Sequence, residues 1–531
     1  TLTEWGCPAG ESQDSLPLPA GSFPLLAPGR SKVYQVGNLK CGSLAGSSMI
    51  FSRFTRIGIL FLLAAVVSAC SEHPRERPAL VVYVVVDQLR GDLLERYDSL
   101  FTGGFRRLHD EGFKFLSATH DHGTTSTAAG HTALSTGAFP FRNGIVANNW
   151  MERTPRGWQS VYCYEDTMTH VLGLPALEGR SPKNLLREGL ADWIVRADSA
   201  AVIVSASRKD RAAIAMAGKT RGHTYWIASN TAEFVTSTFY ADGYPGWLER
   251  INQVEMPVLF GDSVWEQTVP VVARGASRPD TSVYERDGVH TFFPHRFVDE
   301  VSDPSRHGAL NRWGYGLTPP DAALGVFAED AVRVLHLGDD EVIDYLAISF
   351  SQTDDIGHDF GPLSREQLEN LLHLDRTLGK LMKVLDDEVG ENRWFMALTG
   401  DHGAMSMPEY LAEEGVQARR AKREEFAQLR GIFAEHREMD GEPEDVASSL
   451  VSSLEQLPFI ADAMTVLELT TPPVADSFTV LMRNSYHPDR WIGGSGSQGS
   501  GVVFRYVEGF YPSSSPQGTG HGSPYYHDRF V

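Results

Sequence analysis

The stretch ALVVYVVVDQLRGD, residues 79–92, decides the fold class. Its centre is a continuous run of β-branched and aromatic residues with no polar alternation, and the run ends at Asp87. A strand that is apolar on both faces is typical of a parallel sheet with helices on either side. This segment therefore predicts a central strand whose carboxyl end carries an acidic side chain.

Similar apolar runs recur three times further along the chain, at residues 201–204, 343–350 and 394–399. Helical stretches separate them. The clearest, residues 364–389, repeats Leu on one face and begins with a capping-box pair, Ser364 and Gln367. This alternation predicts an α/β fold with a doubly wound, mostly parallel sheet and helices on both faces. Such sheets bind ligands at the carboxyl ends of their strands.

The remaining segments suggest how the chain is organised. We expect the core in two parts, residues 79–238 and 321–531, separated by a cap insertion at 239–320 that is rich in Pro, Gly and aromatic residues. A second insertion, about 408–476, contains a charged helical stretch whose charges we expect to face solvent. The last residues, DRFV, suggest the start of another strand, so we expect a truncated C-terminus.

The N-terminal segment predicts export. After Met49 come basic residues and an apolar run, 57–67, which is too short to span a bilayer and is typical of a signal peptide. Residues 49–70 resemble a bacterial lipoprotein signal peptide, which would lipidate Cys70 and place the protein in the periplasm or at the outer membrane. An ordinary cleaved signal peptide is the alternative. Residues 1–48 are then expected to be a non-native upstream extension.

Charge and cysteine content narrow the class of protein. The net charge of −21 and the pI of about 5.3 argue against a basic nucleic-acid-binding face. An acidic protein that acts on an anionic substrate needs a local positive centre, which metal ions can supply. If Cys7 and Cys41 are not native and Cys70 is lipidated, only Cys163 remains, so we expect no disulfide framework. The sequence leaves the oligomeric state open and favours a monomer.

Residue types that bind metals gather at four predicted strand ends or loops. The set comprises Asp87, Asp354, His358, Asp401, His402 and His521. Each motif alone is more often a turn or a helix cap. Together, carboxylates and imidazoles suit zinc, which takes oxygen and nitrogen ligands in tetrahedral sites. Six ligands are too many for one such ion and suit two, and paired metal ions are a common device for cleaving phosphate esters.

The candidate nucleophile is Thr127, which precedes a short stretch of helical character, Ala128–Thr136. A helix N-terminus has free N–H groups and a positive dipole end, both of which favour a phosphate. A Thr hydroxyl attacks at neutral pH only when it is activated, for example by direct metal coordination. The alternative interpretation is a polar turn that caps the helix.

As an ordered set, these motifs resemble the alkaline phosphatase superfamily. The motifs are VVVDQLRGD, TSTAAGHTALSTG, GIVANNW, SRKDRAA, TDDIGH, TGDHG and GTGHGSPY, over about residues 80–531. They are most similar to the PafA-type bacterial alkaline phosphatases with a Thr nucleophile, close to the nucleotide pyrophosphatase/phosphodiesterase branch. The spacing from Thr127 to Gly130 and His131 favours Thr127 over the hydroxyls just before it. His131, like His120 and His122, is expected to be structural.

The resemblance also implies roles for individual residues. One zinc ion would be held by Asp354, His358 and His521. The other would be held by Asp87, Asp401, His402 and the Thr127 oxygen. Thr127 would attack phosphorus and form a phospho-threonine intermediate. Asn148, with Asn149 as the near alternative, and the backbone N–H of Thr127 would bind a phosphate oxygen.

The substrate class depends on Lys209 and Arg211. On an extended segment both side chains would point to the same side, and two fixed cations would favour the dianionic phosphate of a monoester. The resemblance associates this pair with monoesterases, so we expect an alkaline phosphatase acting on small-molecule phosphate monoesters. A type I phosphodiesterase or nucleotide pyrophosphatase with the same two-metal site is the alternative. A sulfatase or a phosphoglycerate mutase is disfavoured, and a catalytically inactive binding protein remains a further alternative.

Overall fold

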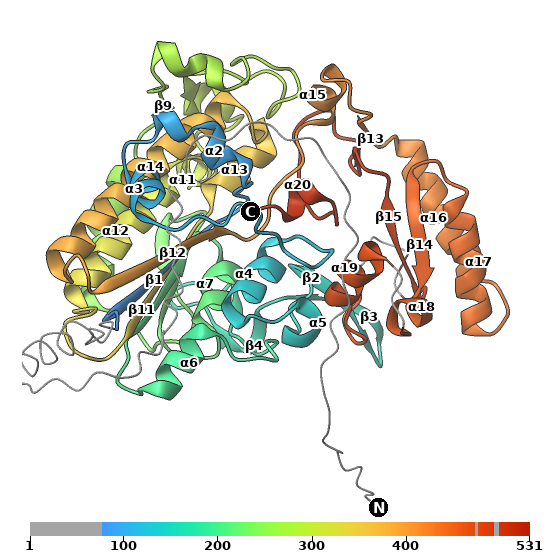
Figure 1. Ribbon diagram of the computed structural model, residues 1–531, viewed down its shortest axis with the longest axis horizontal. Coiled ribbons are helices and arrows are strands. Elements are labelled where there is room, and N and C mark those ends of the chain that lie inside the picture. Colours follow the sequence, from blue (N-terminus) through green and yellow to red (C-terminus); the bar gives the residue numbers. More distant parts are fainter. Residues whose placement is uncertain (1–76, 473–475, 493–496, 498) are drawn as a thin grey trace, which may run out of the picture. The chain divides into compact units, whose positions relative to one another are not determined.

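A central sheet organises the described part of the chain. In the computed structural model, which describes residues 77–531 except 473–475, 493–496 and 498, six strands form this sheet in the order β12-β1-β11-β6-β7-β8 (Figure 1). They are β1 (Leu80–Val86), β6 (Ile203–Ser207), β7 (His223–Ala228), β8 (Glu233–Val235), β11 (Asp344–Phe350) and β12 (Trp394–Gly400). All neighbouring pairs are parallel except β7 and β8. The predicted α/β fold with a mostly parallel sheet is confirmed.

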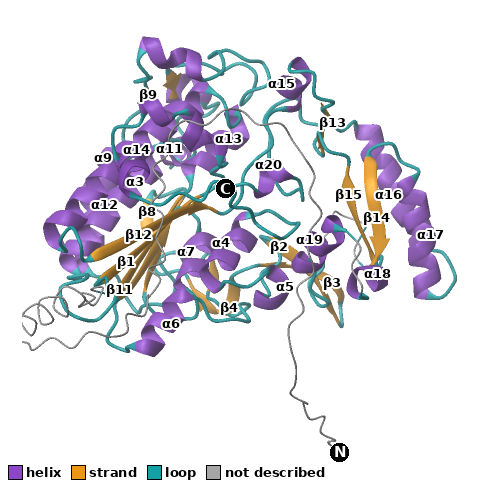
Figure 2. Cartoon of the chain, in the orientation of Figure 1, coloured by secondary structure: helices purple, strands orange, loops and turns teal. Residues whose placement is uncertain are grey.

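Helices cover both faces of this sheet (Figure 2). One layer comprises α3 (Gly104–Glu111), α12 (Pro319–Val334) and α14 (Arg365–Glu388), and the other α4 (Thr127–Thr136), α6 (Leu190–Ala197) and α7 (Asp210–Ala217). Successive residues of a strand point to opposite faces. In β1, Val84 belongs to a buried cluster with Phe327 of α12, whereas Val85 belongs to one with Met216 of α7. The apolar run of β1 is uninterrupted because both of its faces are buried.

Two neighbouring elements show where the sequence prediction was right and where it was wrong. Strand β12 was expected to be buried like β1, but it lies at the edge of the sheet and Phe395 is 56% exposed. Helix α14 agrees with the prediction. Its N-cap, Ser364, accepts a hydrogen bond of 3.0 Å from the backbone N–H of Gln367, which is half of the expected capping box.

Short elements make up residues 239–320, the predicted cap. They are α8 (Gly246–Arg250), the π-helical turn η2 (Ile251–Glu255), α9 (Met256–Leu259), β9 (Val264–Trp265), the 3-10 helix η3 (Val271–Ala276), β10 (His295–Arg296), α10 (Phe297–Glu300), α11 (Ala309–Tyr315) and the start of α12. The segment packs against α12, for example through the rings of Trp247 and Phe327, whose centroids are 5.3 Å apart. That it is an insertion which selects substrates stays a prediction.

The C-terminal third contains a second small sheet with its own apolar core (Figure 1). Its elements are α15 (Pro408–Glu413), β13 (Arg419–Arg420), α16 (Arg423–Arg437), α17 (Pro443–Glu455), β14 (Ile460–Thr465), α18 (Val466–Thr470), α19 (Ser477–Ser485), β15 (Val502–Tyr506), β16 (Phe510–Tyr511) and α20 (Tyr526–Arg529). Helices α16 and α17 pack on the antiparallel pair β14–β15 through Leu429, Phe433 and Leu450. The charged stretch predicted here is therefore an amphipathic helix, α16.

The remaining elements surround the sheet. They are α2 (Asp92–Arg96), η1 (Asp98–Leu100), α5 (Pro140–Asn143), β2 (Asn149–Thr154), β3 (Gly157–Tyr162), β4 (Glu165–His170), β5 (Glu178–Arg180) and α13 (Gln352–Phe360). The residues DRFV do not begin a strand. Asp528 and Arg529 are the last two residues of α20, and Phe530 forms an isolated bridge with Thr119.

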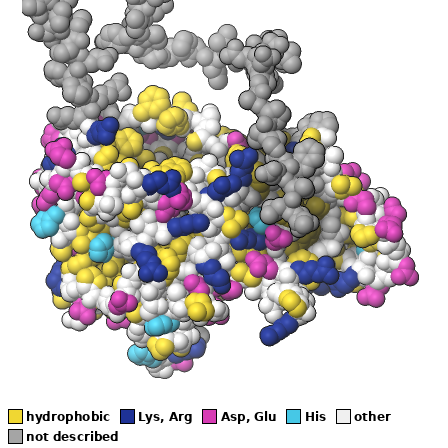
Figure 3. Space-filling view, turned by 90° about the horizontal axis from the view of Figure 1, so that it is seen from below, with side chains coloured by type: hydrophobic (Ala, Val, Ile, Leu, Met, Phe, Trp, Pro, Cys, Tyr) yellow, Lys and Arg dark blue, Asp and Glu magenta, His cyan; other side chains and the backbone are white. Residues whose placement is uncertain are grey.

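Some predictions fall outside the described residues. These are the upstream extension, the signal peptide and the lipidated Cys70. None of the described helices is long and apolar enough to cross a membrane. On the face drawn in Figure 3, Lys and Arg side chains are spread among apolar ones. Cys163 is buried and unpaired, as expected for the one cysteine within the described ranges.

Candidate active site

Three acidic residues follow the carboxyl ends of adjacent strands. Asp87 comes directly after β1, Asp401 directly after β12, and Asp354 lies in the first turn of α13, just after β11. The register sets these ends level, because Val86 pairs with both Phe350 and Gly400. Parallel pairing thus brings together residues that are far apart in the sequence, at the edge of the sheet where such folds bind ligands.

The structure gathers the six predicted ligands into one cluster. Two groups have ligand atoms that all lie within 4.8 Å of one another: Asp354 with His402 and His521, and Asp87 with Asp401 and His402. The sixth residue, His358, places Nε2 3.1 Å from Oδ1 of Asp354. All six side chains are buried or nearly so, apart from His358, whose side chain is 38% exposed.

The grouping differs from the one that the resemblance implies. His402 belongs to both groups, whereas the resemblance assigned it to the Asp87 group alone. The reason is its central position: its ring stacks on that of His521 with centroids 3.6 Å apart, and its Nε2 lies 3.5 Å from Oδ1 of Asp87. The two groups therefore adjoin at His402, which is close enough for two neighbouring ions to act on one substrate group.

Gln88 holds two of the carboxylates and was not identified from the sequence. Its backbone N–H donates to Oδ1 of Asp401 at 3.0 Å, and its side-chain amide donates to Oδ1 of Asp354 at 2.7 Å. Its φ of 62° lies in the left-handed region, which a non-glycine residue rarely adopts. Gly357 makes room for it, since a Cβ there would lie 2.0 Å from Oε1 of Gln88. Only the fold reveals this role.

His131 has a role more specific than the structural one we expected. Its Nδ1 lies 3.0 Å from Oδ2 of Asp401 and 2.9 Å from the carbonyl of Thr127, and its Nε2 lies 2.8 Å from the Ser349 hydroxyl. It therefore links the first turn of α4 to the carboxylate after β12. Gly130 allows this approach, because a Cβ there would lie 2.2 Å from the backbone oxygen of Asp401.

The candidate nucleophile lies at the start of α4. Thr127 is the first residue of that helix and is only 1% exposed. The next backbone N–H, that of Ala128, donates to Oδ1 of Asn148 at 2.9 Å, so the Asn148 amide lies beside the helix N-terminus. Asn149 begins β2 and is exposed. The arrangement therefore favours Asn148 over Asn149 as the residue near Thr127.

Lys209 and Arg211 do not lie as the sequence predicted. The expected extended segment is wrong beyond Lys209, because Lys209 lies at the N-cap position of α7 with an extended backbone and Arg211 lies in the first turn of the helix. The Lys209 ammonium donates to Oδ2 of Asp87 at 2.5 Å and also to Asp354, so it binds two carboxylates of the cluster. A further buried cation, Arg208, pairs with Asp355 and lies over the ring of Tyr315. The segment thus carries more buried positive charge than the predicted pair.

The charged neighbours determine the ionisation of the buried carboxyl groups. Burial alone would raise the pKa of Asp354, but Lys209 and His358 hold it well below its usual range. Burial has the same effect on Asp401, and His131 lowers its pKa overall. Burial and the nearby Asp401 raise the pKa of Asp87 despite Lys209. Two of the three carboxyl groups are therefore stabilised as anions, the form that binds metal.

The donor set suits divalent ions such as zinc. Among the described residues, Oδ1 of Asp87 and Nε2 of His402 are buried with no hydrogen-bond partner. Buried polar atoms without partners are rare and costly. Carboxylate oxygens and imidazole nitrogens are common zinc ligands. The cluster has three carboxylates and three imidazoles, which is enough for three protein ligands at each of two catalytic zinc sites. The residues present therefore fit a metal centre.

Comparison with known proteins identifies the family. Residues 81–524 match the family model described as type I phosphodiesterase / nucleotide pyrophosphatase. The chain belongs to this family. Within the alkaline phosphatase superfamily it is of the PafA type, near the nucleotide pyrophosphatase branch, as the motifs predicted.

Two relatives and one crystal structure illustrate the similarity. The chain is 36% identical over 341 residues to alkaline phosphatase PhoV of Synechococcus elongatus and 32% identical over 356 residues to alkaline phosphatase PafA of Elizabethkingia meningoseptica. These alignments cover 63% and 66% of this chain and span 60% and 64% of the two relatives. The crystal structure of wild-type PafA superposes with a TM-score of 0.75 at 26% identity, covering 86% of this chain and 90% of that one.

Proposed function

We propose that the protein is a zinc-dependent alkaline phosphatase that hydrolyses phosphate monoesters and releases inorganic phosphate. The observation that carries this proposal is the pair of ligand groups that share His402 and lie beside the N-terminus of α4. The names of the relatives support a phosphatase. Two zinc ions, when bound by these groups, would neutralise the charge of a phosphate and help to activate a hydroxyl group.

The residues of the chain divide the work as follows. Thr127 loses its hydroxyl proton to solvent, its oxygen attacks phosphorus, the bond from phosphorus to the alcohol oxygen breaks, and a phospho-threonine forms while the departing alkoxide takes a proton from water. Water then releases inorganic phosphate from the threonine. The Asn148 amide and the backbone N–H of Thr127 bind a phosphate oxygen. His131 orients Asp401, and Gln88 orients Asp354 and Asp401.

A phosphodiesterase or nucleotide pyrophosphatase is the second candidate, and the description of the family favours it. Lys209 and Arg211 separate the two functions, because a monoester carries one more negative oxygen for a cation to stabilise. Replacing both, as Lys209→Ala with Arg211→Ala, should reduce monoester cleavage far more than diester cleavage. Equal losses for the two esters would assign these cations to holding the carboxylates of the cluster instead.

The test of the main proposal compares p-nitrophenyl phosphate with bis-p-nitrophenyl phosphate at alkaline pH, with zinc added and after chelation. A much faster monoester rate that the chelator abolishes and zinc restores supports the phosphatase. A faster diester rate would favour the second candidate function, a phosphodiesterase or nucleotide pyrophosphatase. Thr127→Ala should remove most of the turnover, on the order of 10³-fold or more. A binding protein without catalytic function would show no turnover to lose.

We further propose that the protein is exported and anchored to a membrane by a lipid on Cys70, where it would meet small-molecule phosphate esters. The support is the signal-peptide pattern of residues 49–70. Metabolic labelling with a fatty acid should label the wild-type protein and not Cys70→Ala. A labelled Cys70→Ala protein, or an unlabelled wild-type protein, would leave an ordinary signal peptide as the better explanation.

A further inference from the structure

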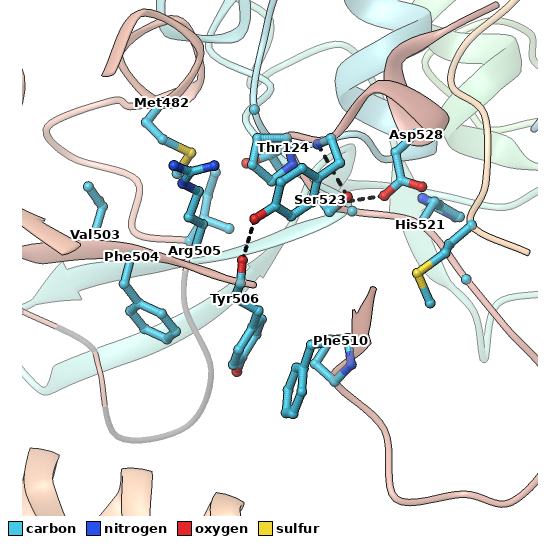
Figure 4. Close-up of a pocket in the computed structure, with 18 of the residues that line it drawn as sticks. Thr124, Met482, Val503, Phe504, Arg505, Tyr506, Phe510, His521, Ser523 and Asp528 are labelled. Carbon is cyan, nitrogen blue, oxygen red and sulfur yellow. Dashed lines mark hydrogen bonds between the residues drawn. The ribbon is translucent and has the colours of Figure 1, made fainter. Parts of the chain in front are cut away.

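A cavity of about 290 Å³ lies next to the candidate active site. It is enclosed by β15, by α19 and by the loop that carries His521 (Figure 4). In Figure 4, His521 and Asp528 lie at one end of the cavity, and Met482, Val503 and Arg505 lie at the other. Its size is near the lower limit for small-molecule pockets and suits one aromatic ring with its substituents.

The cavity shares residues with the candidate site. His521 lines it and is also a member of the ligand group with Asp354 and His402. Thr124 lines it too, three residues before Thr127 in the chain. The cavity therefore adjoins the ligand cluster at His521.

The walls are mainly apolar and aromatic, with one cation, Arg505, and one carboxylate, Asp528, which accepts a hydrogen bond of 2.8 Å from the backbone N–H of Ser523. Residues of β15 alternate in direction, so Val503 and Arg505 share a face. The Arg505 guanidinium lies over the rings of Phe478 and Tyr525, at 4.7 and 5.8 Å from their centroids. Its ion pair with Asp462 is long, at 3.8 Å, and both side chains are about 30% exposed. The Tyr525 hydroxyl already donates to the carbonyl of Tyr506 at 2.5 Å. These walls offer ring faces and a cation more than free hydrogen-bonding groups.

We infer that this cavity binds the alcohol part of the substrate and that it favours aromatic alcohols. The inference rests on the proposed phosphatase function. In an in-line displacement the leaving oxygen points away from the attacking one, and two-metal sites place attacking and leaving oxygens at different ions. Thr127 is linked through His131 to Asp401, a member of the group with Asp87, and the cavity borders the group with Asp354 at His521. The departing alcohol then faces this cavity, where Arg505 and the ring faces favour a flat aromatic group.

The experiment fills the cavity without touching the ligand cluster. Met482→Trp places a large side chain at the far end from His521. We expect kcat/KM for phenyl phosphate to fall by about tenfold or more, with kcat/KM for methyl phosphate changed by less than about twofold. Because each substrate is compared with itself in the wild-type protein, the different reactivity of the two esters cancels. Met168→Trp is the matched control, since Met168 is 87% exposed and does not line the cavity.

A second variant and a second readout cover the case in which Met482→Trp does not fold. Arg505→Met keeps the length of the side chain and removes the cation. It should raise the inhibition constant of phenylphosphonate by about threefold or more and leave that of methylphosphonate unchanged. Inhibition by these two compounds reports binding and needs no turnover of the bound molecule.

The outcomes separate this inference from the function on which it rests. If a folded variant leaves both substrates unchanged, or slows both equally, the cavity does not bind the alcohol, although the phosphatase function stands. If the wild-type protein hydrolyses neither phosphate, the proposed function fails and this inference fails with it.

Discussion

The protein buries two clusters of acidic residues, and the pKa values of two carboxyl groups in one cluster are shifted in the opposite direction from those of two in the other. The first, called the sheet-edge cluster because it lies at the carboxyl ends of β1, β11 and β12, contains Asp87, Asp354 and Asp401. A second cluster, between the predicted cap and α14, contains Asp280, Glu285 and Glu366, and both glutamates are fully buried. Burial and the nearby Glu366 raise the pKa of Asp280 to about 7 and that of Glu285 to about 9. At the sheet edge, the pKa values of Asp354 and Asp401 are lowered.

Their neighbours explain the difference. The sheet-edge carboxylates have an ammonium group, a histidine and the donors of Gln88 within hydrogen-bonding distance. In the second cluster, Glu285 accepts a hydrogen bond of 2.9 Å from the hydroxyl of Tyr410, and Glu366 lies 3.4 Å from Nε2 of His295. Burial by itself leads a carboxyl group to keep its proton, whereas positive charge and donors keep it ionised and able to bind a metal ion.

The largest expected effect separates the two clusters by activity. Asp354→Asn should lower kcat/KM by on the order of 10³-fold and reduce bound zinc per chain, because it removes a charged ligand. Glu366→Gln, the matched change in the second cluster, should keep activity within about threefold. Phosphatase assays and elemental analysis of the purified variants check both. Similar losses in the two variants would mean that the clusters do not differ in function.

A smaller loss of activity should follow from moving α4 away from the sheet edge. In Gly130→Ala the new Cβ would meet the backbone oxygen of Asp401 at 2.2 Å, so the helix that begins at Thr127 must shift. A displacement of about 1 Å costs activity on the order of 10²-fold. Gly431→Ala in α16 is the control, since nothing lies within 4 Å of its Cβ and activity should not change. Full activity in Gly130→Ala would show that the site tolerates this shift.

The second cluster should make stability depend on pH. Below the ordinary pKa of 4.5, Glu285 is protonated in both the folded and the unfolded chain. Between pH 4.5 and about 9 the unfolded chain releases this proton and the folded protein retains it, so the free energy of unfolding falls as the pH rises. Glu285→Gln removes that loss and should be more stable than the wild type by about 1–3 kcal/mol near pH 8.5.

Denaturant titrations of Glu285→Gln and the wild-type protein at pH 4 and pH 8.5 measure this difference. The two curves should coincide at the lower pH. An advantage of the variant at pH 4, or none at pH 8.5, would contradict a retained proton on Glu285.

The smallest effect concerns the helix that carries Glu366. Ser364→Ala removes the N-cap of α14 and should lower the free energy of unfolding by about 1 kcal/mol without changing kcat. Ser452→Ala, at an exposed position inside α17, should change stability by less than about 0.5 kcal/mol. A change in kcat for Ser364→Ala would connect the second cluster to catalysis and contradict the difference in function between the two clusters.

The sequence predicted the features that depend on local pattern. Apolar runs revealed β1 and β11, Leu periodicity revealed α14, and strand ends revealed Asp87 and Asp401. It did not reveal the contacts of Gln88 or His131, or the position of Lys209 on two carboxylates, because these depend on how distant segments approach each other. The burial of Glu285 and Glu366 was missed for the same reason. Glutamates in a Pro-rich loop and in a helical first turn look exposed in a sequence.

The two hydrogen bonds of Gln88 have a consequence for the order of folding. They reach partners 313 and 266 residues away in the chain, so the first needs β1 beside β12 and the second needs β1 beside β11. Contacts of such long sequence separation form slowly, because closing the long loop between the two residues costs entropy before the contact is made. The metal-binding cluster is therefore among the last parts of the protein to assemble. During refolding, the recovery of metal binding should lag behind the recovery of helical structure and coincide with the completion of folding.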